Sequence, residues 1–207
     1  MLTTNDEALW ERAWSFKDHG KSWQAVQRPN HKTVFRWLHE SIGTNWRMAE
    51  IQAAIGRVML GRLPGWVETR RRHARVLSEQ LGRMPAIRVT VPPDHIGHSY
   101  YKYYAFLRGE CLRRDWPRDR IVRALQAEGI PCGSGVCPEI YREKAFDERG
   151  IRPPGRLPVA RELGRTSLML LVHPTLSDGD MLDMCRALEK VLRRAQAADS
   201  KLVGRAA

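Results

Sequence analysis

Two polar residues, Asn45 and Arg47, are the first candidates for chemistry in this sequence. They flank Trp46 in the stretch GTNWRMAEIQAAIG, residues 43–56, in which small and apolar residues follow at helical spacing. The pattern predicts that Arg47 falls in the first turn of a helix, where the positive end of the helix dipole disfavours a cation. An anion bound nearby would make an arginine useful there. The alternative is that Asn45 only caps the helix and Arg47 points to solvent.

The cysteines indicate no metal chemistry. There are four, Cys111, Cys132, Cys137 and Cys185, and the closest pair in PCGSGVC has four residues between its members. A structural zinc site needs about four ligands, usually as two close pairs, and no second pair is present. The cysteines are also too sparse for a disulfide scaffold. We therefore predict reduced, structural thiols and no metal.

The composition predicts a folded protein and leaves one rival function open. The chain has 207 residues, 43% hydrophobic and 28% charged, with a net charge of +12 and a pI of about 10.1. Such a charge favours a nucleic-acid partner, but the basic residues are spread along the chain, and the densest run, residues 69–75, fits a solvated helix face. The aromatic stretch at 98–107 could stack bases, or form a half-buried strand. With no apolar run long enough for a bilayer and no signal peptide pattern, we expect a cytoplasmic protein without a membrane partner.

Helical elements are expected to position the Asn45–Arg47 stretch. Residues 1–4 resemble the end of a strand, and Thr4 with Glu7 fits a capping box for a helix that stops near Gly20. Residues 21–42 are predicted to be a long loop with short strand pieces. A helix is predicted from about 46 to 61, and the LPG sequence that follows is predicted to break it before a third helix over 64–81.

A small α+β unit is predicted from about residue 85. The runs at 86–91, 99–107 and 167–172 are rich in strand-forming residues. A helix is expected over 117–129, and another from Ser177 or Asp178 to about 195, before a frayed tail. Because the chain opens on a strand end with no sheet to join, it looks like the C-terminal part of something longer.

The stretch at 43–56 resembles the G-x-N-x-R-M-x-x-I-Q-A-A-I-G signature of the DegT/StrS family of sugar aminotransferases. The segments MLTTNDEALWERAWSFKDHGK, LPGWVETRRRHARVLSEQL, GIPCGSGVCPEIYREKAF and LPVARELGRTSLMLLVHPTLSD are similar to family segments in the same order. The resemblance implies an α/β chain, the C-terminal part of the fold-type-I pyridoxal-phosphate (PLP) aminotransferase fold. It implies a remnant of the large domain over 1–62, a linking helix over 63–84, a small α+β domain over 85–196 and a flexible tail over 197–207.

The resemblance also implies roles for particular residues. Asn45 would bind the phosphate of the PLP cofactor of a neighbouring subunit in a homodimer, with Arg47 in support, because helix N–H groups and an arginine both favour phosphate. Cys137 and Tyr141 lie where the family presents substrate contacts, although the usual histidine or tyrosine is replaced there. The Schiff-base lysine is expected upstream of Met1, so no catalytic residue is assigned. Lys17 and Lys21 lie beyond its expected position and are rejected as substitutes.

The function implied is amino transfer, typically from glutamate, to a keto sugar attached to a nucleotide, in the biosynthesis of surface polysaccharide or aminosugars. We expect the isolated chain to be inactive, as a truncated gene product, a split gene or a pseudoenzyme half. The alternative is a non-enzymatic basic module that binds nucleic acid.

Overall fold

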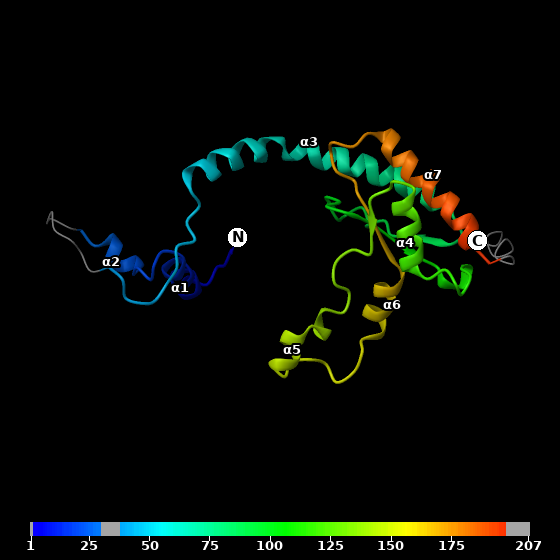
Figure 1. The fold of residues 1–207 in the computed structure, drawn as a ribbon. Coiled ribbons are helices and arrows are strands. Elements are labelled where there is room, and N and C mark those ends of the chain that lie inside the picture. Colours follow the sequence, from blue (N-terminus) through cyan, green and yellow to red (C-terminus); the bar gives the residue numbers. More distant parts are fainter. Residues whose placement is uncertain (1, 30–37, 198–207) are drawn as a thin grey trace. The chain divides into compact units, whose positions relative to one another are not determined.

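The computed structural model describes residues 2–29 and 38–197. The chain divides into two compact units, Met1–Gly61 and Arg62–Ala207, and one long helix, α3 (Glu50–Leu81), passes from the first into the second. Figure 1 shows the elements in chain order. The predicted assignment of domains to a remnant, a link and a small domain stays a prediction.

The first unit contains α1 (Glu7–Lys17) and α2 (Trp23–Gln27). Trp23 lies edge-on to both Trp10 and Trp14, with ring centroids 5.0 Å apart in each pair, so α2 packs on α1 through aromatic rings. Asp6 caps α1 by accepting a hydrogen bond from the N–H of Leu9 at 3.0 Å.

Several expectations for this unit were wrong. The cap of α1 is Asp6 rather than Thr4, and residues 2–4 form no strand. The predicted loop over 21–42 contains α2, because Ser22 accepts from the N–H of Ala25 and provides a cap that the sequence reasoning passed over. The part of that loop over 30–37 lies outside the described residues.

The predicted break between residues 61 and 64 is absent, because α3 continues through Pro64. A proline inside a helix costs about 3 kcal/mol through its missing N–H and its ring. That cost is local, because the proline removes the hydrogen bond of one N–H while the turns of α3 on either side keep theirs. The start of α3 is also later than predicted, at Glu50 rather than near Trp46.

The second unit is built on a four-stranded antiparallel sheet of order β1-β2-β4-β3. Its strands are β1 (Ile87–Val89), β2 (Tyr103–Leu107), β3 (Cys132–Gly133) and β4 (Ser167–Leu170). Alternate residues of β2 are buried, which is the pattern of a strand with one face on a core. The predicted strands at 86–91, 99–107 and 167–172 are confirmed in shortened form; β3 was not predicted.

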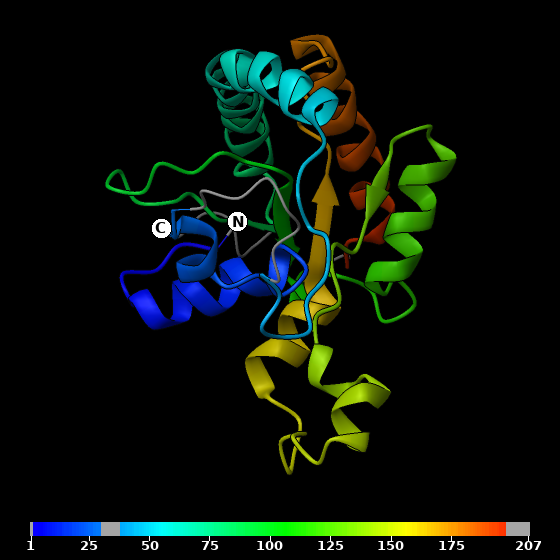
Figure 2. The same cartoon turned by 90° about the vertical axis from the view of Figure 1, so that its left-hand side faces the viewer.

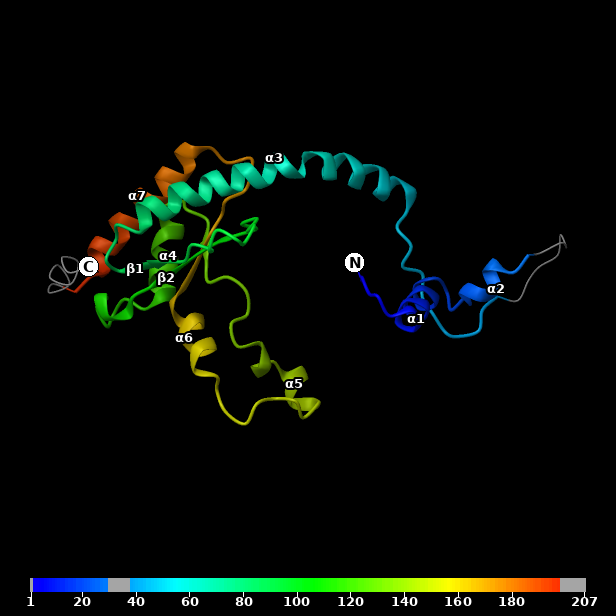
Figure 3. The ribbon, with the colours of Figure 1, turned by 180° about the vertical axis from the view of Figure 1, so that it is seen from behind.

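Helices cover this sheet. They include α4 (Arg118–Ala127), α7 (Asp178–Ala195) and the C-terminal half of α3, and residues of all three share one core with the strands. Figures 1 and 3 show α7 alongside that half of α3 from opposite sides. The predicted helices over 117–129 and 177–195 are confirmed, and Ser177 is the cap of α7.

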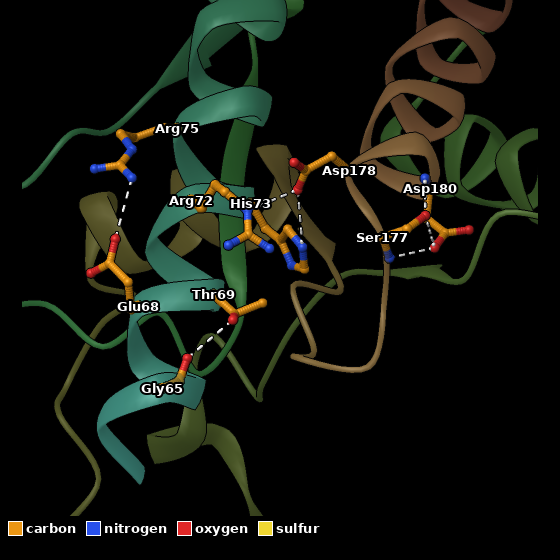
Figure 4. A network of polar contacts seen from close by, with 9 residues as sticks. All are labelled: Gly65, Glu68, Thr69, Arg72, His73, Arg75, Ser177, Asp178 and Asp180. Carbon is orange, nitrogen blue, oxygen red and sulfur yellow. Dashed lines mark hydrogen bonds and ion pairs between the residues drawn. The ribbon is translucent and has the colours of Figure 1, made fainter. Parts of the chain in front are cut away.

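Polar contacts join α3 to the start of α7 (Figure 4). Asp178 Oδ1 lies 3.1 Å from Arg72 Nε and 3.4 Å from Nε2 of the fully buried His73. Ser177 and Asp180 form a capping box at the first turn of α7. These contacts join the C-terminal half of α3 to the first turn of α7.

The chain makes an excursion between β3 and β4. It contains the short 3-10 helix η2 (Ile140–Arg142), α5 (Lys144–Glu148) and α6 (Pro158–Thr166), while another 3-10 helix, η1 (Gly109–Cys111), follows β2. Figure 2 shows α6 (yellow) leading into β4. The excursion carries Cys137 and Tyr141.

Candidate functional site

The loop that carries Asn45 is hydrogen-bonded to the end of α1 through its backbone. The N–H of Thr44 donates to the carbonyl of Phe16 at 2.7 Å, and the N–H of Trp46 donates to the carbonyl of Lys17 at 2.9 Å. The N–H of His19 donates back to Thr44 at 3.0 Å. This pairing commits the backbone around Trp46 to a bridge, so the helix cannot start there.

Two glycines allow this close approach. Gly20 has φ +82°, a conformation that favours glycine, and a Cβ there would lie 1.8 Å from the carbonyl oxygen of Ser41. A Cβ on Gly43 would lie 2.3 Å from the backbone nitrogen of Gly20. The glycine that opens the 43–56 stretch therefore serves to bring the loop against the turn after α1.

Asp18 holds Arg47 in place. The Asp18 carboxylate is buried, with Oδ2 at 2.7 Å from Arg47 Nη2 and Oδ1 at 3.3 Å from Lys21 Nζ. Burial by itself would raise the pKa of Asp18, but the Lys21 hydrogen bond and the charges of Lys21, Arg47 and Lys17 outweigh it, so the pKa lies below its usual range. Asp18 therefore stays ionised and orients a guanidinium whose side chain remains 57% exposed.

Asn45 presents a donor to solvent. Its Oδ1 accepts a hydrogen bond from the N–H of Arg47 at 3.3 Å, and its backbone pairs with Asp18 in an isolated bridge. Within the described ranges, the side-chain amide nitrogen has no hydrogen-bond partner, and the residue is exposed. The loop thus fixes the side chain through its oxygen and leaves its N–H groups available to an acceptor.

The charges around the loop suit an anion. Lys17, Lys21 and Arg47 gather around the single carboxylate of Asp18, which leaves an excess of positive charge. The prediction that Arg47 lies in the first turn of a helix is wrong, because α3 begins only at Glu50. The N–H of Ala49, just before α3, donates to the side chain of Gln52 at 2.9 Å. Anion binding at this loop therefore depends on side chains and not on the helix dipole.

An aromatic hollow adjoins the loop. It has a volume of about 620 Å³ and is lined by Leu2, Trp10, Ala13, Trp14, Phe16, Lys17 and Trp46. Trp46 is 70% exposed and meets Phe16 edge-on at a centroid distance of 5.3 Å. The loop therefore places a hydrogen-bond donor, a cation and an apolar surface within a few residues of one another.

The predicted substrate residues lie in the second unit. Cys137 is exposed, and its thiol donates to Glu143 at 3.5 Å. Tyr141 is buried, and its hydroxyl donates to Glu139 at 2.6 Å and accepts from the N–H of Leu157 at 2.9 Å. The Tyr141 hydroxyl is thus committed to the fold of the excursion, while the Cys137 thiol is accessible.

Glu139 ties the two arms of the excursion together. Arg156 donates to both carboxylate oxygens of Glu139, once at 3.0 Å, and Arg142 Nη1 lies 3.7 Å away. The hydrogen bonds from Arg156 and then Tyr141 lower the pKa of Glu139 to about 2. Sequence reasoning missed both Glu139 and Asp18, because the arginine that pairs with each of them, Arg156 and Arg47, is distant in the chain.

The described residues contain no group of three or more histidine, cysteine, aspartate or glutamate side chains that could hold a metal ion. No helix within residues 2–29 and 38–197 combines the length and the apolar character that crossing a bilayer requires.

Comparisons with known proteins match the chain to one family. Residues 1–189 match the DegT/DnrJ/EryC1/StrS aminotransferase family. The GDP-perosamine synthase of Caulobacter vibrioides is 29% identical over 93% of this chain and 47% of its own length. The dTDP-4-dehydro-2,3,6-trideoxy-D-glucose 4-aminotransferase of Saccharopolyspora spinosa is 26% identical over 93% of this chain and 48% of its own length.

A solved structure agrees. The aminotransferase of Psychrobacter cryohalolentis superposes with a TM-score of 0.85 at 43% identity, covering 93% of this chain and 51% of that one. The chain therefore has the fold of part of a PLP aminotransferase, and it spans about half the length of the relatives that it matches.

Proposed function

Because the chain belongs to the DegT/DnrJ/EryC1/StrS aminotransferase family, we propose that it is part of a PLP-dependent aminotransferase acting on nucleotide-linked keto sugars. Two matched relatives bear names that specify a GDP-linked and a dTDP-linked sugar product or substrate. The amino donor proposed is glutamate, and the compartment proposed is the cytoplasm.

The observation that supports this function best is the loop of Asn45 and Arg47. A phosphate needs hydrogen-bond donors and positive charge, and the loop offers the free amide of Asn45 and the guanidinium that Asp18 orients. The residues present therefore fit the phosphate of PLP. When bound, the cofactor supplies the electron sink for amino transfer, and this chain's part is to hold the phosphate, across the interface of a homodimer.

The second unit is proposed to contribute to the sugar side of the site. The Cys137 thiol is accessible and remains the candidate contact. Tyr141 is proposed to position the segment that follows Cys137, because its hydroxyl is hydrogen-bonded to Glu139 and to the N–H of Leu157. This assignment separates one residue that touches substrate from one that places it.

The proposed catalytic lysine lies in the part of the family fold that this chain does not span. Lys21 is engaged by Asp18, and Lys17 lies 5.5 Å from the ring centroid of Trp14, so both have structural roles here. We therefore expect no transamination by the chain alone. A pyridoxal absorbance band that borohydride removes, with a labelled lysine inside these residues, would overturn this expectation.

A chimera tests the proposed function. The 207 residues replace the matching segment of the Psychrobacter cryohalolentis aminotransferase, and the product is assayed with PLP, glutamate and GDP- or dTDP-linked 4-keto sugars. We expect glutamate-dependent amination of a nucleotide-linked sugar. A folded, PLP-loaded chimera that aminates none of these sugars would contradict the proposal.

A further inference from the structure

A second hollow lies in the second unit, where the chain passes from β2 to α4. It has a volume of about 530 Å³, within the range of small-molecule sites. We call it the arginine hollow; its lining includes Arg113, Arg114, Trp116, Arg118, Asp119 and Arg165. Leu107 and Leu112 add apolar surface, so the charged groups stand around a partly apolar wall.

Two arginines of the hollow have unused guanidinium groups. Arg114 and Arg165 are both exposed, and neither has an ion-pair or hydrogen-bond partner for its side chain in the described part of the chain. They come from different elements, the loop before α4 and the last turn of α6. A ligand bound in the hollow would accept hydrogen bonds from two separate elements.

A third arginine is already fixed. Arg118 is only 15% exposed; its Nη1 donates to the carbonyl of Ser167 at 3.2 Å and its Nε donates to Asp119 at 2.5 Å. These contacts hold the guanidinium rigid and leave Nη2 without a partner among the described residues. A preorganised guanidinium loses little entropy when it binds an oxyanion.

The carboxylates nearby do not neutralise the hollow. Asp115 is shared between Arg113, through two hydrogen bonds of 3.1 Å, and Arg120 Nη1 at 3.0 Å. Four arginines line the hollow, Arg113, Arg114, Arg118 and Arg165, and the one carboxylate among its lining residues is Asp119. The surplus positive charge matches a ligand with several negative charges.

We propose that the arginine hollow binds a diphosphate group, with Arg114 and Arg165 donating to its oxygens beside the fixed Arg118. Arginine suits phosphate because its planar fork makes two parallel hydrogen bonds to neighbouring oxygens. Two such forks on separate elements fit a diphosphate better than a single phosphate. The diphosphate is either inorganic or part of a nucleotide.

The arginine hollow shares no residue with the site of the proposed function. It lies wholly within the second unit and includes none of Asn45, Arg47, Cys137 and Tyr141. A failure to bind diphosphate at the hollow would therefore leave the proposed aminotransferase function untouched.

Calorimetric titration of the 207-residue chain tests the proposal, with pyrophosphate and a nucleoside diphosphate as probes at constant ionic strength. The test variant is Arg114→Gln/Arg165→Gln, which removes two exposed, unpaired arginines. The matched control is Arg57→Gln/Arg149→Gln, which makes the same charge change at two exposed arginines outside the hollow that also have no side-chain partner within residues 2–29 and 38–197.

We expect one saturable site for pyrophosphate, weakened at least tenfold in the test variant and less than twofold in the control. Tighter binding of the nucleoside diphosphate, lost in the same variant, assigns the site to a nucleotide; equal binding assigns it to the diphosphate alone. Lack of saturation below about 1 mM, or equal weakening in both variants, overturns the proposal. So does a single-stranded oligonucleotide that binds more tightly than pyrophosphate and is lost in the test variant.

Discussion

Asp18 fixes the conformation of the loop that carries Asn45. Its buried carboxylate joins Arg47 and Lys21, and its backbone pairs with Asn45. The types of Asn45 and Arg47, and the resemblance of their stretch, pointed to this loop from the sequence alone. Asp18 could not be found in that way, because an aspartate at the end of a helix is common and its partner lies on another segment.

Replacing Asp18 by Asn keeps the size of the side chain and removes its charge. We expect the loop to open more often, since hydrogen bonds to charged groups contribute about 1.5–3 kcal/mol. Amide exchange at Thr44 and Trp46 should accelerate about tenfold. Asp183→Asn, which breaks the exposed pair with Arg186, is the control and should leave these two amides unchanged. Equal exchange rates in wild type and Asp18→Asn would contradict this role.

The lowered pKa of Glu139 means that acid pH destabilises the excursion. Its pKa falls from 4.5 to about 2 on folding, so its stabilising contribution is fully present above about pH 4.5 and is lost as the pH falls through about 2. Carbon-13 NMR of the Glu139 carboxyl should show a midpoint near 2.

Arg156→Gln should move this midpoint back towards 4.5, because the hydrogen bond from Arg156 is the largest cause of the shift. Arg161→Gln removes an exposed arginine whose side chain has no partner among the described residues, and it should leave the midpoint near 2. A midpoint near 4.5 in wild type would show that the Glu139–Arg156 pair is absent in solution.

At the scale of elements, periodicity predicted the second unit well. The buried alternation of β2 and the apolar face of α7 are local patterns, so a strand within 99–107 and a helix over 177–195 are predicted correctly. The prediction of a break at Pro64 is wrong, because the proline removes the hydrogen bond of one N–H while the turns of α3 on either side keep theirs. Tertiary pairing of Trp46 with Lys17 likewise delays the start of α3 in a way that no local pattern reveals.

Gly43→Ala tests the packing of the loop against the turn after α1. A Cβ at 2.3 Å from the Gly20 nitrogen forces the backbones apart, and we expect a loss of at least about 2 kcal/mol, measured by amide exchange at Thr44. Gly56→Ala is the matched control. Nothing lies within 4 Å of its Cβ in α3, so it should stabilise the helix by about 0.5–1 kcal/mol. Similar effects of both changes would refute the close-packing role of Gly43.

At the scale of the whole molecule, the N-terminal half of α3 carries an exposed apolar face. Ile51, Ile55 and Val58 share one side of the helix and are 71%, 57% and 54% exposed. Faces of this kind mark interaction sites. Since the matched relatives are about twice as long as the chain, we propose that the part of the family fold outside this chain covers the face.

Dye binding tests that proposal. The chain alone should increase the fluorescence of a hydrophobic dye, and Ile51→Glu/Ile55→Glu should reduce the signal. The chimera, in which the face is covered, should bind dye no more than the double variant does. A chimera that binds as much dye as the chain alone would show that the face is not the contact with the remaining fold.

The most direct measurement is the dissociation constant of PLP in the chimera carrying Asn45→Ala. We predict at least about tenfold weaker binding, because one hydrogen bond to a charged phosphate is lost. Asn5→Ala, at an exposed asparagine away from the loop, should leave the constant unchanged. An Asn45→Ala chimera that holds PLP as tightly as its parent would contradict the account that this loop binds the cofactor phosphate.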